Sequence, residues 1–436
     1  MPVNETYGKE ELHRLQKDTF SYFLHETDVS TGLVRDSTHT GSPASIAAVG
    51  LALASYVVAA ERGFMERAEA AARTLTTLRF FWNSPHGDAP DATGYKGFYY
   101  HFLHMSSGRR AWDCELSTVD TAHLLAGALA AAAYFGGKDT EETEIREIAD
   151  RLYRRVEWPW ATNRGRTLTH GWRPESGFLP YRWVGYSEAL ILYLLALGSP
   201  THPLPRSSYS AFTSEYRWRR LYGEEFLYAG PLFIHQLSHV WVDFRGIRDA
   251  FMRAKRCDYF ENSRRATYAH QRYGVRNPRK FKCYGEFCWG ITASEGPGPA
   301  TLLVEGVERR FFDYVARSIP RGPDDGTLAP WAVVASLPFA PEIVLPTLRH
   351  IDDLGVGKAS PYGFEATFNP TFPTDSGKPC GWVSPRNFGL NDGPIVLMIE
   401  NYRSGLVWRL MRRCPYLVRG LRRASFRGGW LDKMAR

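Results

Sequence analysis

Three stretches of the chain carry small or apolar side chains at nearly every position. They are residues 44–62 (ASIAAVGLALASYVVAAER), 117–135 (STVDTAHLLAGALAAAAYF) and 189–197 (ALILYLLAL). A helix that is apolar on all sides is buried between neighbouring helices rather than laid on a surface. The pattern therefore predicts three buried helices in the first half of the chain.

More polar stretches alternate with these three. Residues 10–25, 64–83 and 140–156 place apolar side chains at helical spacing among charged ones, which predicts amphipathic helices. Further candidate helices lie within 213–240, 244–272, 299–318, 327–336, 340–354 and 393–412. No region alternates with period two for long, and no polar linker divides the chain.

This alternation predicts an all-α fold, an (α/α)6 toroid in which an inner ring of helices is wrapped by an outer ring. We expect it to form one domain over residues 1–408. A stack of helical hairpins is the alternative, but such stacks rarely carry loops as long and aromatic as residues 84–116.

Carboxylates stand where several long loops meet a predicted helix. Glu188 follows Ser187, a candidate N-cap, at the start of the apolar helix 189–197. The helix dipole stabilises an ionised glutamate at this place, so a purely structural role is the alternative. An acid role requires aromatic walls or a second carboxylate to raise the pKa of Glu188.

Other carboxylates occur in similar loop positions. They are Glu115, Asp120, Asp243, Glu286, Glu295 and Asp392. Asp120 can also form a capping box with Ser117, and Asp243 can pair with Arg245. Carboxylates gathered at one end of a toroid suit glycosidic bond cleavage, in which one group protonates the leaving oxygen and another activates water or attacks carbon.

Composition adds aromatic side chains and an uneven charge. Aromatic residues make up 14% of the chain, and such rings stack on sugars when they lie in clefts, although most will fill the core. Residues 409–436 contain nine Lys or Arg and one acid, which accounts for the whole formal charge of +8. Residues 1–408 are therefore formally neutral, which excludes a nucleic-acid-binding surface there. The basic C-terminal tail 409–436 is either a solvated segment, which we favour, or a contact to an anionic membrane.

Metal and cofactor motifs are absent from the sequence. The six cysteines include no CxxC pair and no zinc-type spacing, and there is no P-loop, GxGxxG or GxSxG motif, so we expect no cofactor and no metal. No apolar run reaches membrane-spanning length. The N-terminus lacks a signal segment, so we expect a cytoplasmic protein if this N-terminus is native, and a periplasmic or secreted one if a leader was removed.

Nine short segments, in order, resemble the glucoamylase-like bacterial proteins that include the endo-β-1,2-glucanases of glycoside hydrolase family 144. The segments are Ala44–Ala48, Glu115–Thr121, Gly185–Ala189, Leu197–His202, Ala229–Phe233, Asp243–Gly246, Trp289–Ser294, Asp392–Pro394 and Ile399–Arg403. They cover nearly the whole chain up to about residue 408. The resemblance implies an (α/α)6 toroid without cofactor that inverts the anomeric centre of linear β-1,2-glucan.

The same resemblance assigns roles to individual residues. Glu188 looks like the acid, which reaches the leaving oxygen through a substrate hydroxyl, and Asp392 looks like the base. Glu115 and Asp120 look like additional cleft acids, and in related transglycosylase domains of cyclic glucan synthases an acid near Glu115 is the nucleophile. Expected substrate contacts are Trp112, Tyr186, Trp172, Arg245, Trp289, Glu295 and Tyr362.

Two departures and several alternatives accompany this hypothesis. Glu295 stands where the family pattern has Asp, and Cys114 stands where a serine is more usual; both affect the shape of the cleft. The alternatives are a retaining transglycosylase, an exo-acting hydrolase, and a sugar-binding protein without turnover. A uronate lyase or epimerase would use Arg173, Arg182 or Arg245. In each case the expected partner is an oligo- or polysaccharide.

Overall fold

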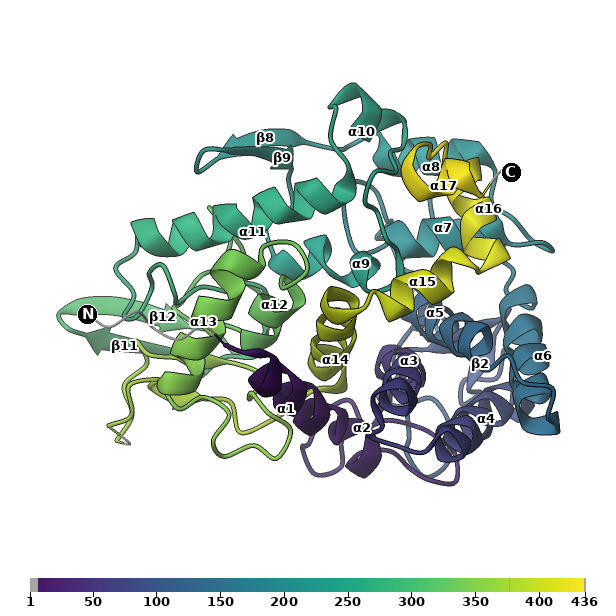
Figure 1. Ribbon diagram of the computed structural model, residues 1–436, viewed down its shortest axis with the longest axis horizontal. Coiled ribbons are helices and arrows are strands. Elements are labelled where there is room, and N and C mark those ends of the chain that lie inside the picture. Colours follow the sequence, from purple (N-terminus) through teal and green to yellow (C-terminus); the bar gives the residue numbers. More distant parts are fainter. Residues whose placement is uncertain (1–6, 376, 435–436) are drawn as a thin grey trace.

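The computed structural model describes residues 7–375 and 377–434 (Figure 1). Within these residues, six buried helices follow one another around the centre: α3 (Ile46–Arg62), α5 (Thr118–Tyr134), α7 (Leu190–Gly198), α9 (Leu237–Trp241), α12 (Pro330–Ala335) and α14 (Gly389–Arg403). Each contacts its neighbours in that order, and α14 returns to α3. Between α9 and α12 the link is Gln236, which donates a hydrogen bond to the Ala332 carbonyl at 2.6 Å. These helices form a closed inner ring.

An outer helix covers each inner one. The pairs are α1 (Lys9–Phe20) on α14, α4 (Arg67–Asn83) on α3, α6 (Thr140–Arg154) on α5, α16 (Pro415–Arg423) on α7, α11 (Tyr259–Arg276) on α9, and α13 (Pro341–Asp353) on α12. The predicted all-α (α/α)6 toroid is therefore confirmed. The three helices predicted to be buried, α3, α5 and α7, belong to the inner ring, as their uniform apolar composition requires.

Glycines allow two of these helix pairs to approach closely. A Cβ atom on Gly127 of α5 would lie 1.9 Å from the backbone oxygen of Gly50 in α3. A Cβ atom on Gly420 of α16 would likewise lie 1.9 Å from the backbone oxygen of Leu194 in α7. Any side chain at these two positions would force the helices apart.

The interpretation of residues 409–436 as a solvated tail is wrong. This segment contains the end of α15 (Leu406–Arg412), all of α16, and α17 (Gly429–Lys433). Leu417, Val418 and Leu421 are buried against the toroid, while Arg419 and Arg422 point outward. Because this segment is rich in Arg, its few apolar positions were not recognised as one face of an amphipathic helix, and this helix, α16, completes the outer ring.

The predicted helix within 299–318 is also wrong, because these residues form the hairpin of β11 (Ala300–Val304) and β12 (Val307–Phe311). Glu305 and Gly306 join the strands with φ angles of 52° and 77°, as a type I′ turn requires. Each strand has a single buried residue, Val304 or Phe311, and its other positions are partly or fully exposed, so the strands carried no strong period-two signal.

The remaining elements are short. The other helices are α2 (Tyr22–His25), α8 (Arg206–Thr213), α10 (Ala250–Ala254) and the 3-10 turns Trp160–Thr162 and Leu232–His235. The other paired strands are β1 (Ala44–Ser45) with β4 (Phe102–Leu103), β8 (Trp218–Leu221) with β9 (Glu224–Leu227), β10 (Ala293–Ser294) with β13 (Val315–Ala316), and β14 (Phe368–Asn369) with β15 (Trp382–Val383). One five-stranded sheet has the order β2 (Gly94–Tyr95), β3 (Phe98–Tyr100), β5 (Leu116–Ser117), β6 (Gly171–Arg173), β7 (Gly177–Phe178).

Among the described residues, no helix combines the length and apolar character needed to cross a membrane.

Candidate active site

A cavity of about 490 Å³ opens where the N-terminal ends of the inner helices converge. Each inner helix contributes to its wall from the first turn or from the residues just before it: Ser45, Asp120, Glu188, Leu237, Trp331 and Asn391. Helix N-termini carry unpaired N–H groups and a partial positive charge, which favours carboxylates and polar ligands there. The architecture thus gathers acidic loops from the whole length of the chain.

His101 joins two of the predicted acids on one side of the cavity. Its Nδ1 lies 3.1 Å from Glu115 Oε1, and its Nε2 lies 3.5 Å from Asp120 Oδ2. Burial favours the neutral ring, but the charges of Asp120 and Glu115 outweigh it and raise the pKa of His101 to about 9. Burial likewise opposes ionisation of Glu115, yet the hydrogen bond and charge of His101 hold the pKa of Glu115 below its ordinary value. At neutral pH this side of the cavity therefore carries a His⁺ between two carboxylates.

Glu188 lines the cavity in the turn before α7. Ser187 does not cap this helix: its hydroxyl is buried without a partner among the described residues, and no side chain caps the start of α7. Burial, and secondarily the charge of Asp120, raises the pKa of Glu188 to about 7. The environment that an acid role requires is therefore present, and it outweighs the helix dipole.

Asp36 is a cavity acid that the sequence pattern did not single out. Burial raises the pKa of Asp36 to about 6, with the charge of His101 opposing the shift and that of Asp120 adding to it. Tyr314, with 68% of its surface exposed, lines the same space. Asp120 lines the same cavity, and its charge adds to the raised pKa values of both Glu188 and Asp36.

Asp392 does not line the cavity, although Leu390 and Asn391 do. Its side chain is 1% exposed, and its Oδ2 has no hydrogen-bond partner among the described residues. Burial raises the pKa of Asp392 well above its usual range. The structure thus places a buried carboxyl outside the cavity lining, where burial disfavours its ionised form.

Two of the predicted substrate contacts lie at the cavity. Glu295 lines it, accepts a hydrogen bond from Ser384 Oγ at 2.5 Å and pairs with Arg386 at 2.9 Å. Trp112 is 65% exposed, and its ring lies 5.1 Å from that of Phe102, a wall residue, which places Trp112 at the rim.

Five predicted contacts do not line the cavity, because each side chain has partners elsewhere. Tyr186 packs in an aromatic cluster with Tyr216, His235 and Tyr259, and Trp172 packs with Tyr95 and Trp160. Trp289 donates to Thr347 Oγ1 at 2.9 Å, Tyr362 donates to Glu26 at 2.9 Å, and Arg245 pairs with Asp243 at 2.8 Å.

Arg182 donates to the backbone carbonyls of Thr162 and Thr167. Arg182 and Arg245 therefore do not support the uronate alternative.

His123 contributes a hydrogen-bond donor that was also missed. Its Nδ1 accepts a hydrogen bond from Trp241 Nε1 at 2.9 Å, and burial lowers the pKa of His123 to about 4. A neutral ring whose Nδ1 accepts must carry its proton on Nε2. Among the described residues this Nε2 has no partner, so the cavity wall holds a free N–H donor. His123 lies near the start of the buried helix α5, which is the signal that could have identified it, whereas Asp36 and His101 lie in loops that carry no such signal.

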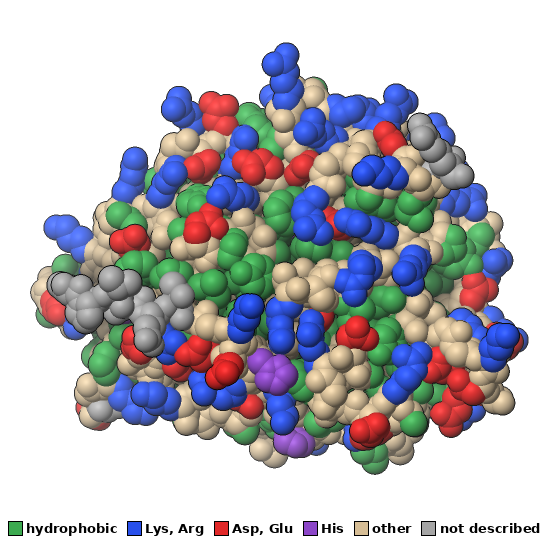
Figure 2. Space-filling view, viewed as in Figure 1, with side chains coloured by type: hydrophobic (Ala, Val, Ile, Leu, Met, Phe, Trp, Pro, Cys, Tyr) green, Lys and Arg blue, Asp and Glu red, His purple; other side chains and the backbone are tan. Residues whose placement is uncertain are grey.

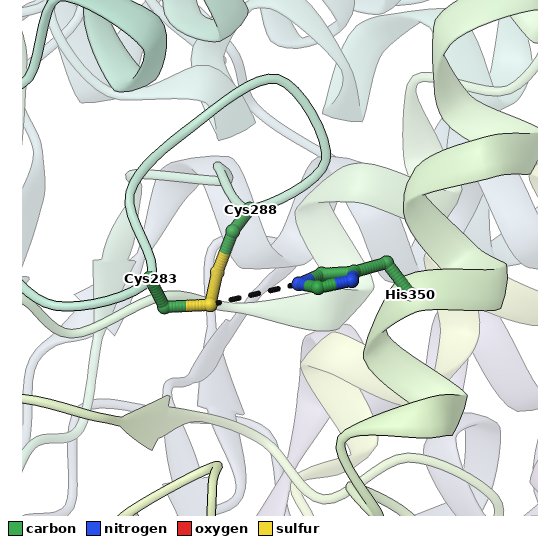
Figure 3. A group of neighbouring side chains, drawn as sticks. All are labelled: Cys283, Cys288 and His350. Carbon is green, nitrogen blue, oxygen red and sulfur yellow. Dashed lines mark hydrogen bonds between the residues drawn. A yellow bond between two sulfur atoms is a disulfide. The ribbon is translucent and has the colours of Figure 1, made fainter. Parts of the chain in front are cut away.

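Cys283, Cys288 and His350 form a separate group away from the cavity (Figure 3). Their ligand-type atoms lie within 4.8 Å of one another, and His350 Nε2 is 3.7 Å from Cys283 Sγ. The two sulfurs are joined in a disulfide, whereas metal binding by cysteine requires thiolates. The sequence spacing concealed this group because His350 comes from α13, far along the chain from the two cysteines.

The double helical ring and its mouth lined with carboxylates define a protein of the glucoamylase-like toroid class. The Glycoamylase family, described as "Putative glucoamylase", matches residues 180–415, which is more than half of the chain. The chain belongs to this family, and the resemblance seen in the sequence is confirmed.

Individual relatives agree with this assignment. The chain is 30% identical to a protein of Bacteroides uniformis described as a putative glucoamylase, with a TM-score of 0.86 and coverage of 98% and 99% of the two chains. It is 25% identical to an endo-β-1,2-glucanase from Chitinophaga pinensis, in complex with sophorotriose and glucose, with a TM-score of 0.83 and coverage of 96% and 98%. It is 29% identical, over 94% of its length, to an exo-β-1,2-glucooligosaccharide sophorohydrolase of Parabacteroides distasonis, and it spans 57% of that protein.

Proposed function

We propose that this protein is a glycoside hydrolase that cleaves β-1,2-linked gluco-oligosaccharides by general acid–base catalysis. The observation that carries the proposal is Glu188, a carboxyl in the cavity whose pKa is raised to about 7. A carboxylic acid that keeps its proton near neutral pH can protonate a leaving oxygen. The choice of linkage rests on the relatives, whose names specify β-1,2-glucans.

In this mechanism Glu188 gives its proton to the leaving oxygen, directly or through a substrate hydroxyl, as the glycosidic C–O bond breaks. A water molecule loses its proton to a carboxylate on the other side of the sugar ring, and its oxygen bonds to the anomeric carbon. We assign this base role to Asp36. With a pKa of about 6, its carboxyl is largely ionised at neutral pH and still basic enough to accept a proton.

The base predicted from the resemblance was Asp392, and the two candidates can be separated by matched variants. Asp36 lines the cavity, whereas Asp392 is buried outside it, and burial raises the pKa of Asp392. If Asp36 is the base, Asp36→Asn loses about a hundredfold or more in kcat, the usual contribution of such catalysis. Asp392→Asn then affects mainly the melting temperature. The reverse result would move the base role to Asp392.

The size of the cavity favours a short ligand. Its volume of about 490 Å³ falls within the range of roughly 300–1,000 Å³ found for pockets that enclose small ligands. Trp112 at the rim offers an aromatic face to a sugar outside the enclosed part. We therefore expect short oligosaccharides as products, as from an exo-acting enzyme.

A retaining transglycosylase is the second candidate, and Glu115 supports it. His101 keeps Glu115 ionised within the cavity, and an ionised carboxylate is what a nucleophile requires. In that case the first products keep the β configuration, and longer oligosaccharides appear.

The experiment that tests the function is incubation with linear β-1,2, β-1,3, β-1,4 and α-1,4 glucans, followed by NMR of the products. Short β-1,2 products that appear first as α-anomers support the inverting hydrolase. Glu188→Gln should abolish this turnover without unfolding the protein, whereas the exposed Glu308→Gln should leave it unchanged. Normal turnover in Glu188→Gln, or no turnover of any glucan by the wild type, would refute the proposal.

A further inference from the structure

Five arginines surround a second concavity, between α8 and α16. Arg206 opens α8, Arg413 precedes α16, and Arg419, Arg422 and Arg423 project from α16. The concavity measures about 460 Å³, and its other wall residues are Pro415, Val418 and Met434. We call it the arginine pocket. Figure 2 shows Lys and Arg side chains gathered on the part of the surface around α15 and α16.

The positive charges of the arginine pocket have no acidic partner among residues 7–375 and 377–434. Within residues 7–375 and 377–434, none of the five guanidinium groups forms an ion pair, and no carboxylate lines the pocket. Arg423 donates one hydrogen bond to the Leu204 carbonyl at 2.8 Å, while its Nε is buried without a partner in that same part of the chain. Burial, followed by the charges of Arg419 and Arg206, lowers the pKa of Arg423. Like charges thus repel one another here without a compensating group.

The pocket rests on a rigid base. Arg419, Arg422 and Arg423 stand at helical spacings of three and four residues, so they share one face of α16. The opposite face is held against α7 by the close contact of Gly420 with Leu194. The Leu204 carbonyl fixes Arg423 in place. The helix backbone that carries these arginines, and the side chain of Arg423, are therefore fixed before a ligand binds.

The arginine pocket and the catalytic cavity are separate. Glu188 stands just before α7, whereas α16 packs against the far end of α7, where Gly198 approaches the Tyr416 carbonyl. The two concavities share no wall residue. A ligand in the arginine pocket therefore would not compete with the sugar.

We propose that the arginine pocket binds a phosphate group with at least two negative charges. Guanidinium groups form paired, charge-assisted hydrogen bonds with phosphate oxygens, and several unpaired arginines around one concavity provide this repeatedly. A soluble oligophosphate and the headgroup of an anionic phospholipid share this chemistry. The concave form of the pocket suits a group that projects into it.

The test is isothermal titration of the full chain with inorganic pyrophosphate at about physiological ionic strength, where weak surface attraction is screened. Arg419→Glu/Arg422→Glu should weaken binding at least about tenfold, because each charge-assisted hydrogen bond is worth a factor of that order. Arg409→Glu/Arg427→Glu makes the same change of charge at exposed arginines outside the pocket and should change the affinity less than about twofold. Arg419→Gln/Arg422→Gln repeats the test if the glutamates impair folding.

A second arm distinguishes the two sources of phosphate. Co-sedimentation with vesicles containing phosphatidylglycerol, reversed by pyrophosphate and lost in Arg419→Glu/Arg422→Glu, would identify a lipid headgroup. Pyrophosphate binding without co-sedimentation would identify a soluble phosphate. The proposal fails if neither probe binds, or if the control variant loses as much affinity as the pocket variant. Turnover of β-1,2-glucan should be the same in all these variants, so the outcome is independent of the proposed catalytic role.

Discussion

The two raised carboxyl pKa values predict a narrow, bell-shaped dependence of kcat/KM on pH. In the proposed mechanism the base, Asp36, must be ionised, so activity rises as the pH increases through about 6. The acid, Glu188, must be protonated, so activity falls above about pH 7. The product of the two active fractions is largest near pH 6.5. At two pH units to either side, about one twentieth of the maximum should remain.

Asp120→Asn tests the origin of this profile. Asp120 adds to the raised pKa of both Glu188 and Asp36, so removing its charge stabilises both ionised forms. Both limbs of the profile should therefore move to lower pH. Glu115 does not act on Glu188 in this way, so Glu115→Gln should leave the alkaline limb in place and serves as the matched control.

The assay is initial-rate hydrolysis of a β-1,2-gluco-oligosaccharide at substrate concentrations far below KM, between pH 4 and pH 9. Under these conditions kcat/KM reports the groups of the free enzyme. A flat profile between pH 6 and pH 9 would show that no acid with a pKa of about 7 controls the reaction. An unchanged alkaline limb in Asp120→Asn would show that the two carboxyls are not coupled.

Two further predictions concern packing and substrate binding. Gly420→Ala should lower the free energy of unfolding by about 3 kcal/mol, because the new Cβ would meet the Leu194 carbonyl. The control Gly136→Ala should change it little, because no atom lies within 4 Å of the new Cβ. Urea denaturation of both variants measures the difference. His123→Phe should lower kcat/KM about tenfold through loss of the Nε2–H donor, measured by hydrolysis kinetics, and unchanged kinetics would mean that this donor does not touch substrate.

Three of the six inner helices, α3, α5 and α7, could be predicted to be buried because their composition leaves no alternative. Residues 44–62 and 117–135 have no polar face to expose, so their place inside follows from burial alone. The hairpin 300–311 and helix 415–423 could not be recognised in the same way. Their apolar positions are few, and the packing partners that stabilise them lie far away in the sequence.

The candidate site was predicted only in part. Glu115, Asp120, Glu188 and Glu295 were found because each stands in a distinctive segment at or near the junction of a loop with a helix or strand, and all four line the cavity. Asp36 lies in a loop ten residues before α3, and the order of residues does not encode that this loop reaches the cavity while the side chain of Asp392 does not.

Four of the aromatic residues expected to contact substrate, Tyr186, Trp172, Trp289 and Tyr362, do not line the cavity, for a related reason. Trp289 and Tyr362 stand beside glycines, as sugar-stacking rings often do, but each satisfies its polar atom inside the protein. Nothing in the local sequence distinguishes a ring that faces substrate from one that fills a gap in the core.

The pairing of α16 with α7 constrains the order in which the molecule can assemble. All nine residues of α7 are buried, yet the outer helix that covers it is synthesised more than two hundred residues later. During synthesis an apolar face of α7 therefore stays exposed until α16 has been made. Contacts of such long sequence separation also form slowly. Closure of the toroid is thus a late event in folding. A chain truncated so that it ends before residue 415 lacks α16 and should aggregate rather than form a smaller enzyme.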